Sequence, residues 1–290
     1  MATLDLRPLS LGEILDRSFS LYRENFIMFI GIAAIPRLLV LALRLVQIFL
    51  GVSSQIRNMP GSPRGVAIAP TTPLGAGASI GVGLMLVIVS IIAYLFIQGA
   101  TVSAVADLYM GRPTTIGGSF RMVSDELGIL FGVTVLTFLV TLGGLFLLVI
   151  PGIYMACRLI VSVPAAVLEN LRARKALERS LALTRGSAGR AFMIMLLYFV
   201  LAIAVGAVFT WPPSIGLVAA RNNPAMMRMW MAITQVSTEF AGVLITPVLM
   251  IAISVFYFDL RVRKEAFDLQ MLLNPAAGLR SAPGTASSAP

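Results

Sequence analysis

Four ionisable side chains lie inside the long apolar stretches of this 290-residue sequence, and their surroundings give them the greatest scope for chemistry. They are Arg37, Arg44, Arg158 and Glu239. A charged group in hydrocarbon costs several kcal/mol unless it is paired or hydrated. These residues therefore form either structural ion pairs that fix helix packing or the lining of a polar cavity or lipid-headgroup site.

Depth along the predicted helices indicates which charges can meet. Arg37 lies about 16 Å inside the first apolar segment, and Glu239 lies about 13 Å inside the last one, counted from the opposite side. In a hydrocarbon core about 30 Å thick these depths are compatible, so we expect an Arg37–Glu239 ion pair. Arg44 is two turns beyond Arg37 and can snorkel to the outer surface. Arg158 has no evident partner in the sequence unless it shares Glu239.

A second group of cations follows the fourth apolar segment. Its members are Arg172, Arg174, Lys175, Arg179 and Arg185. Clusters of this kind next to a membrane span bind anionic lipid headgroups. They also set the orientation of a membrane protein, so the cluster is either a headgroup site or a topology signal alone.

The remaining residues argue against catalysis. The sequence has no His, and Cys157 is its single cysteine. With no His, one Cys and no cluster of carboxylates outside the charged surface helices, the chain cannot assemble a metal site or a His-assisted nucleophile. The glycine-rich stretch 75–83 lacks the Lys of a phosphate-binding loop. We therefore predict a non-enzymatic protein without cofactor or metal.

The composition is that of an integral membrane protein. Hydrophobic residues make up 58% of the chain and charged residues 12%, whereas soluble domains carry roughly 25% charged residues. The mean hydropathy is +0.92. The net charge of +9 is explained by the positive-inside rule rather than by nucleic-acid binding, so the bilayer is the expected partner, with a membrane protein as a further possible one.

Six apolar segments are long enough to be transmembrane helices. The predicted spans are 26–50, 79–106, 127–150, 153–168, 191–211 and about 230–258. Pro151-Gly152 is expected to turn the third span into the fourth, and Trp211-Pro212-Pro213 to end the fifth. Residues 51–78, rich in Pro, Gly and Ser, are expected to form an irregular loop.

Short amphipathic helices precede three of these spans. Residues 10–25 place apolar side chains on one face and charged side chains on the other, and Ser10 and Glu13 have capping-box spacing. The pattern returns at 176–185 and more weakly at 115–124, which predicts helices in the bilayer interface. The expected fold is all-α: six transmembrane helices in three repeats of interfacial helix plus hairpin.

The repeat units cover about 10–112, 114–172 and 175–261 within one membrane domain, residues 1–273. Each hairpin ends on an acid followed by a base: Asp107 and Arg112, Glu169 and Arg172, and Asp259 and Arg261. Residues 259–273 are expected to form a charged amphipathic end, and residues 274–290 a disordered tail.

The distribution of cations predicts the orientation. Of the 22 Lys and Arg residues, 15 lie on the side of both termini, 4 on the opposite side and 3 inside the spans. This bias places both termini in the cytoplasm. Trp211 and Trp230 then lie at the outer interface, where tryptophan is enriched.

Three motifs resemble the bacterial family known as the membrane domain of glycerophosphoryl diester phosphodiesterase. They are Leu11-Gly12-Glu13-Ile14-Leu15-Asp16-Arg17-Ser18-Phe19 with residues 21–26, Ala176-Leu177-Glu178-Arg179-Ser180 with residues 183–186, and Tyr257-Phe258-Asp259-Leu260-Arg261 with residues 262–269. The resemblance implies a multi-pass module of the bacterial cytoplasmic membrane. In members that are phosphodiesterases, hydrolysis looks like the work of a separate soluble domain with histidines and metal-binding carboxylates. No catalytic residue carries over to these 290 residues.

Two functions follow as hypotheses. The leading one is a non-enzymatic membrane scaffold, regulatory or bilayer-sensing module. The alternative is a small transporter or lipid-handling protein that uses Arg37, Arg44, Arg158 and Glu239. A dry, mutually paired set of charges favours the first, and a hydrated cavity around them favours the second.

Overall fold

The described part of the chain consists of helices and one short β-hairpin. The computed structural model describes residues 9–49, 55–58, 66–69, 73–220 and 223–265. The elements, in chain order, are α1 (Leu11–Glu24), α2 (Phe26–Phe49), β1 (Gln55–Asn58), β2 (Val66–Ala69), α3 (Pro73–Tyr109), α4 (Ile116–Leu147), α5 (Val149–Leu159), α6 (Ser162–Glu169), α7 (Ala173–Leu183), α8 (Ala188–Ala219) and α9 (Pro224–Glu265).

Six segments of the described chain are long and apolar enough to cross a membrane, which supports the predicted multi-pass character. They are Phe26–Phe49, Ile80–Tyr109, Ile116–Leu147, Val149–Glu169, Ala188–Ala219 and Ala225–Glu265. Many of their large apolar side chains are exposed, such as Phe146 at 86% and Ile27 at 84%. Such surface is stable where lipid rather than water surrounds it.

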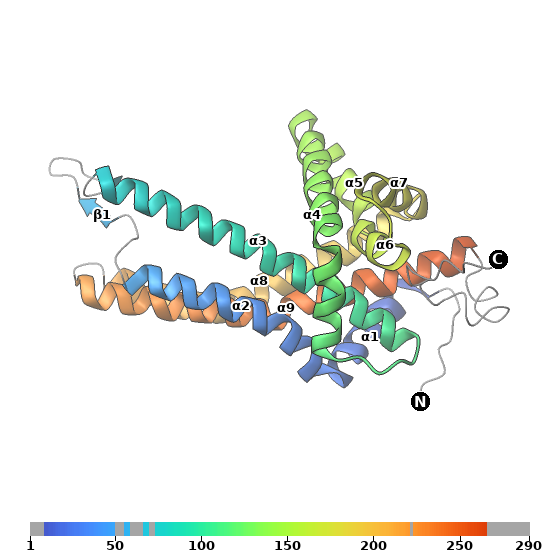
Figure 1. The fold of residues 1–290 in the computed structure, drawn as a ribbon, viewed down its shortest axis with the longest axis horizontal. Coiled ribbons are helices and arrows are strands. Elements are labelled where there is room, and N and C mark those ends of the chain that lie inside the picture. Colours follow the sequence, from blue (N-terminus) through green and yellow to red (C-terminus); the bar gives the residue numbers. More distant parts are fainter. Residues whose placement is uncertain (1–8, 50–54, 59–65, 70–72, 221–222, 266–290) are drawn as a thin grey trace, which may run out of the picture.

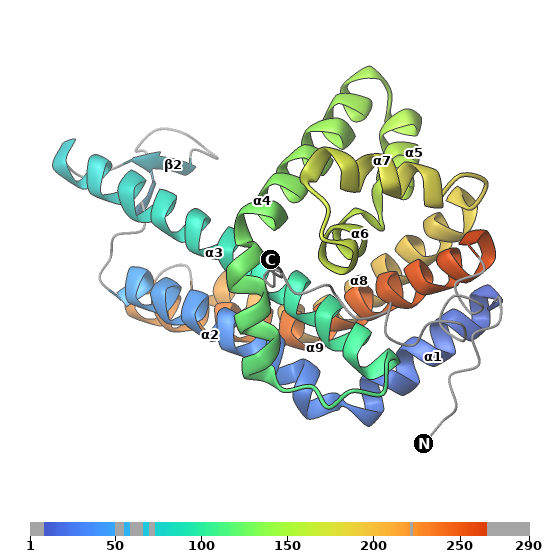
Figure 2. The same cartoon turned by 45° about the vertical axis from the view of Figure 1, so that its right-hand side comes forward.

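Helix α9 lies at the centre of the packing. It contacts α8 and α2 along the bundle and also packs against α3 and α1 (Figure 1). Tyr257, Phe256 and Ile251 on α9 are fully buried. Helix α4 runs across the direction of this bundle in both views, and α5, α6 and α7 lie beside it (Figure 2).

Helix α1 begins with the predicted capping box. The backbone N–H of Glu13 donates to Ser10 Oγ at 3.3 Å, and the backbone N–H of Ser10 donates to Glu13 Oε2 at 2.6 Å. Its apolar face is turned partly toward the protein, because Ile14 is fully buried while Phe19 stays 44% exposed. The Tyr22 hydroxyl donates to the carbonyl of Leu244 on α9 at 2.8 Å, and burial raises the pKa of Tyr22 to about 12.

The three-repeat arrangement is not confirmed. Helix α1 ends at the C-cap Asn25, and the glycine Gly186, with φ +80°, follows α7. The expected helix at 114–126, in contrast, is the first part of α4, which starts at its N-cap Thr115 and continues into the span. No comparable stop separates the amphipathic part of α4 from its apolar part, so the two form one helix.

Three predicted boundaries differ from the structure. The third span turns at Leu148, which is extended (φ −169°, ψ 151°), and Pro151 lies in the first turn of α5, where its missing N–H costs little. The fourth span is broken between α5 and α6. Helix α8 continues through Pro212 and Pro213, with the Thr210 hydroxyl bonded to Gly206 O at 2.6 Å.

The segment 51–78, predicted as an irregular loop, contains the antiparallel pair β1–β2, in which Ile56 lies opposite Ile68, and the start of α3. Residues 266–290, including the predicted tail at 274–290 and most of the charged end at 259–273, lie outside the described residues. Helix α9 continues through the first part of that charged end, to Glu265.

The α4–α5 turn depends on two glycines that face each other. A Cβ on Gly144 would lie 3.0 Å from Gly152 Cα, and a Cβ on Gly152 would lie 2.7 Å from the backbone nitrogen of Leu145. Backbone atoms cannot move aside as a flexible side chain can, so the two helices approach closely only with glycine at these positions.

We predict that Gly152→Ala lowers the free energy of unfolding by about 1–3 kcal/mol, the usual cost of overpacking. Gly143→Ala is the control, because nothing lies within 4 Å of a Cβ there. Denaturation in detergent measures both variants. Equal stability of the two would contradict the close contact at Gly152.

Candidate functional site

The Arg37–Glu239 ion pair predicted from depth is present. Arg37 Nη1 lies 3.0 Å from Glu239 Oε2, and Arg37 Nη2 donates to Thr246 Oγ1 at 2.8 Å. The side chains are 23% and 11% exposed, so the surrounding helices exclude most solvent from the pair. The pair connects α2 to α9 inside the apolar bundle.

The pair is part of a longer chain of polar contacts, which we name the polar ladder: Arg44, Gln235, Glu239, Arg37 and Thr246. Gln235 Nε2 donates to Glu239 Oε1 at 3.2 Å, and Arg44 Nη1 donates to Gln235 Oε1 at 3.3 Å. Sequence reasoning missed Gln235. Its i,i+4 spacing before Glu239 on one helix face is the signal that could have found it.

Gly242 makes room for the ladder. A Cβ at this position would collide with Arg37 Nη1 and would lie 2.7 Å from Arg37 Cζ. The guanidinium therefore lies directly against the backbone of α9. Because no side chain separates them, Arg37 reaches both Glu239 and Thr246 from one position.

Arg158 does not share Glu239, an option that the sequence left open. Its Nε donates to Thr184 Oγ1 at 3.1 Å, and its Nη1 donates to the Tyr154 hydroxyl at 3.0 Å. Its Nη2 donates to the carbonyl of Leu181 at 2.5 Å. The cation thus stabilises the C-terminal end of α7, where free carbonyls favour positive charge.

A second polar cluster joins α9 to the start of the described chain and to α8. Asp259, whose side chain is fully buried, accepts from the backbone N–H of Leu9 at 2.7 Å, from Arg190 Nη1 at 2.7 Å and from Arg263 Nε at 3.0 Å. Arg263 Nη2 in turn donates to the Leu9 carbonyl at 2.6 Å. We call these residues the terminal polar network. The name also covers Glu169 and its partners, which are described next: Tyr257, Arg179, Glu265 and Arg261.

Glu169, the last residue of α6, is the other centre of this network. It accepts from the Tyr257 hydroxyl at 2.6 Å and from Arg179 Nε at 2.8 Å. Arg179 also pairs with Glu265, and Glu265 lies 3.1 Å from Arg261. Burial acts to lower the pKa of the Arg179 guanidinium, but its hydrogen bonds and charge interactions with Glu169 and Glu265 outweigh this and raise the pKa.

The sequence pointed to these acids only as a recurring acid-then-base pattern at the hairpin ends. In the structure, the acids of two such pairs, Glu169 and Asp259, are centres of contact between distant elements. Four bases of the terminal polar network surround them: Arg179, Arg190, Arg261 and Arg263.

The predicted headgroup cluster divides into inward and outward residues. Arg179 turns inward to Glu169 and Glu265. Arg174 is exposed and pairs with Glu178 at 3.0 Å across one helical turn. Arg172, Lys175 and Arg185 are exposed. Arg179 is therefore structural in its contacts, and the other four cations lie on the outer face of α7 and just beyond its ends.

Within the described residues, no group of three or more Cys, Asp or Glu side chains could hold a metal ion. Cys157 is buried and lies 3.9 Å from the sulfur of Met195. The predicted site residues thus fall into four places: the polar ladder, the end of α7, the outer face of α7 and, for Arg179, the terminal polar network.

We predict that Arg37→Leu and Glu239→Leu each lower the free energy of unfolding, because either change leaves one charge unpaired in the bundle. The double variant should be more stable than the sum of the two single losses implies. The expected coupling energy is about 1–3 kcal/mol. The exposed pair Arg174–Glu178, 88% and 62% exposed, is the control. Its own cycle should give a coupling of less than about 0.5 kcal/mol. Equal coupling at the two pairs, measured by denaturation in detergent, would contradict a buried ion pair.

Asp259→Asn keeps the size of the side chain and removes its charge, which leaves Arg190 and Arg263 without their carboxylate. We expect a loss of about 1–3 kcal/mol in the free energy of unfolding. Asp125→Asn, at an exposed position on α4, should change stability little. An Asp259→Asn protein as stable as its Asp125→Asn control would show that the network does not hold the helices together.

Comparison with known proteins identifies one part of the chain. Residues 138–273 match the model of the family described as the membrane domain of glycerophosphoryl diester phosphodiesterase. No curated protein and no solved structure matches. Two of the three motifs, at 176–186 and 257–269, lie in the matched region, and the motif at 11–26 lies before it. The predicted resemblance is confirmed over residues 138–273, which are similar to the membrane domain of glycerophosphoryl diester phosphodiesterase.

Proposed function

We propose that the chain is a non-enzymatic module of the bacterial cytoplasmic membrane that couples an anionic membrane surface to its transmembrane helices. The observation that carries the proposal is the position of α7. Its inner face is bonded to α5, α6 and α9, while its outer cations are exposed.

The bonds that hold α7 come from several elements. Ser180 Oγ donates to the carbonyl of Arg158 at 2.8 Å, and Arg158 itself donates to the carbonyl of Leu181. Lys264 Nζ, on α9, donates to the carbonyls of Ala182 at 3.0 Å and Arg185 at 2.8 Å. A force applied at the outer face of α7 is therefore transmitted to α9, which contacts most of the other helices.

Charge complementarity indicates the partner of this face. Arg172, Lys175 and Arg185 are exposed, and an exposed pair such as Arg174–Glu178 contributes little, so Arg174 can exchange partners. With both termini in the cytoplasm, as the excess of cations on that side predicts, the outer face of α7 meets the anionic inner leaflet. Each cation near such a surface contributes about 1 kcal/mol of binding.

The other functional hypotheses have less support. The sequence contains no His to act as general acid or base in phosphodiester hydrolysis. Transport through the polar ladder would require α2 to move past α9. The Arg37–Glu239 pair and the close approach at Gly242 oppose this movement, since each holds the two helices in one register.

The test compares two doubly substituted proteins of equal net charge. In nanodiscs, replacing part of the phosphatidylcholine with phosphatidylglycerol should raise the thermal midpoint of the wild-type protein. Arg172→Gln with Lys175→Gln should remove about half of this rise, since two of the four outer cations, at about 1 kcal/mol each, are lost. Arg23→Gln with Arg121→Gln, also at exposed positions, should keep it.

If both double variants lose the rise equally, the effect is one of overall charge and the role of α7 is refuted. A wild-type midpoint that does not depend on phosphatidylglycerol would also refute the proposal.

A further inference from the structure

A groove opens between α2, α3 and α9 near the β-hairpin end of the bundle, where α2 and α3 diverge (Figure 1). Its volume is about 500 Å³, within the range of ligand sites. Polar side chains line one part of it: Arg44, Gln47, Ser90, Tyr94 and Gln235. Apolar side chains line the rest: Ile48, Leu86, Val87 and Ile91.

The polar part of the groove carries an excess positive charge. The polar ladder contains two cations, Arg37 and Arg44, and one acid, Glu239, which is paired with Arg37. Among the described residues, Arg44 has one hydrogen bond, to the neutral amide of Gln235 at 3.3 Å. A cation in an apolar span without an acid beside it is costly, so an anion next to Arg44 would stabilise the site.

Other groups in the groove can also bind an anion. The Ser90 hydroxyl oxygen is buried and has no hydrogen-bond partner among the described residues. The Tyr94 side chain, 40% exposed, lines the groove one turn further along α3. Arg44 lies about 8 Å from the end of α2 at Phe49, nearer to the end of this apolar span than to its middle.

The apolar walls of the groove fit a ligand that carries a hydrocarbon chain beside its anionic group. Val87 and Ile91 are 55% and 40% exposed and form an apolar strip along α3, while Leu86 is buried beside them. A strip of this kind, open toward the bilayer, accommodates an acyl chain. An inorganic anion would leave it uncovered.

We propose that this groove binds one anionic phospholipid, with its phosphate at Arg44 and Ser90 and an acyl chain along Val87 and Ile91. The site lies at the opposite end of the bundle from α7. It goes beyond the coupling role proposed above and does not depend on it.

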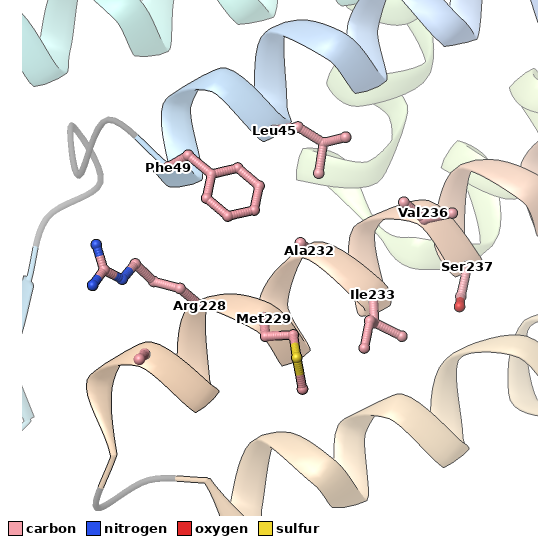
Figure 3. A pocket seen from close by; sticks show the side chains of 9 residues that line it. Leu45, Phe49, Arg228, Met229, Ala232, Ile233, Val236 and Ser237 are labelled. Carbon is pink, nitrogen blue, oxygen red and sulfur yellow. The ribbon is translucent and has the colours of Figure 1, made fainter.

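A second groove, on another face of α2, serves as a comparison. Its volume is about 640 Å³, and Figure 3 shows it between the last turns of α2 and the start of α9. Leu45, Phe49, Met229 and Ile233 line it, with Arg228 near the α2 terminus. It offers a cation at the same end of the molecule but lacks the polar ladder.

The experiment measures bound lipid by native mass spectrometry of the full chain released from micelles that contain phosphatidylglycerol or phosphatidylcholine. We expect tighter binding of phosphatidylglycerol. Arg44→Gln should weaken it about tenfold or more, and Arg44→Lys should keep most of it, since a charge-assisted bond to phosphate is lost only in the first. Arg228→Gln is the charge-matched control and should have little effect.

Ile91→Trp tests the apolar wall with all charges intact and should also weaken binding. Unchanged binding in Arg44→Gln, or an equal loss in Arg228→Gln, would overturn the site. Displacement of the lipid by inorganic phosphate, or a loss in Arg44→Gln without a loss in Ile91→Trp, would overturn the lipid assignment in favour of a free anion. Arg172→Gln with Lys175→Gln should leave this binding unchanged. The result for the groove is therefore independent of the result for the outer face of α7.

Discussion

A charge inside a lipid bilayer must find a partner, and α9 supplies the acids that meet this requirement in two places. Glu239 and Asp259 are 20 residues apart on α9, a separation of about 30 Å along a helix. Glu239 lies among the apolar helices and pairs with Arg37, while Asp259 lies where α1, α8 and α9 meet. Because both acids are on one continuous helix, the contacts at the two ends of the bundle are held in a fixed relation.

The two places differ in their balance of charge. In the terminal polar network, Asp259 faces Arg190 and Arg263, and Glu169 and Glu265 face Arg179 and Arg261. The arginines there are 19–36% exposed, so solvent can hydrate what the acids do not neutralise. The polar ladder lies within an apolar, membrane-length part of the bundle and, among the described residues, has one acid for two cations. The physical need for an external anion is therefore greatest at Arg44.

The parts of the fold that follow from local chemistry were predictable from the sequence. The capping box at Ser10 and Glu13 depends on spacing alone, and the Arg37–Glu239 pair follows from depth along two apolar segments. The errors arose where local signals are overridden by neighbours. Pro212 and Pro213 normally end a helix, yet α8 continues through them.

Asp259 and Glu169, the centres of the terminal polar network, were harder to predict from the sequence for a related reason. Nothing in the residues around Asp259 shows that its partner Leu9 lies 250 positions away, and nothing around Glu169 indicates the Tyr257 hydroxyl. The roles of Gln235 and Gly242 likewise become apparent only when α2 and α9 are side by side, because Gln235 then contacts Arg44 and Gly242 lies against Arg37. Long-range contacts of this kind are set by the packing of whole helices, which hydropathy and periodicity do not specify.

The same contacts decide which helices can move. Separating α2 from α9 would expose Arg37 and Glu239 unpaired within the apolar bundle, which makes the open state costly. Helix α3 borders the groove opposite Arg44 and places there the Ser90 hydroxyl, which has no partner among the described residues. A ligand that bridges Arg44 and Ser90 would connect α3 to the α2–α9 pair. Lipid binding there would thus add a polar contact between α3 and two helices that the Arg37–Glu239 pair already joins.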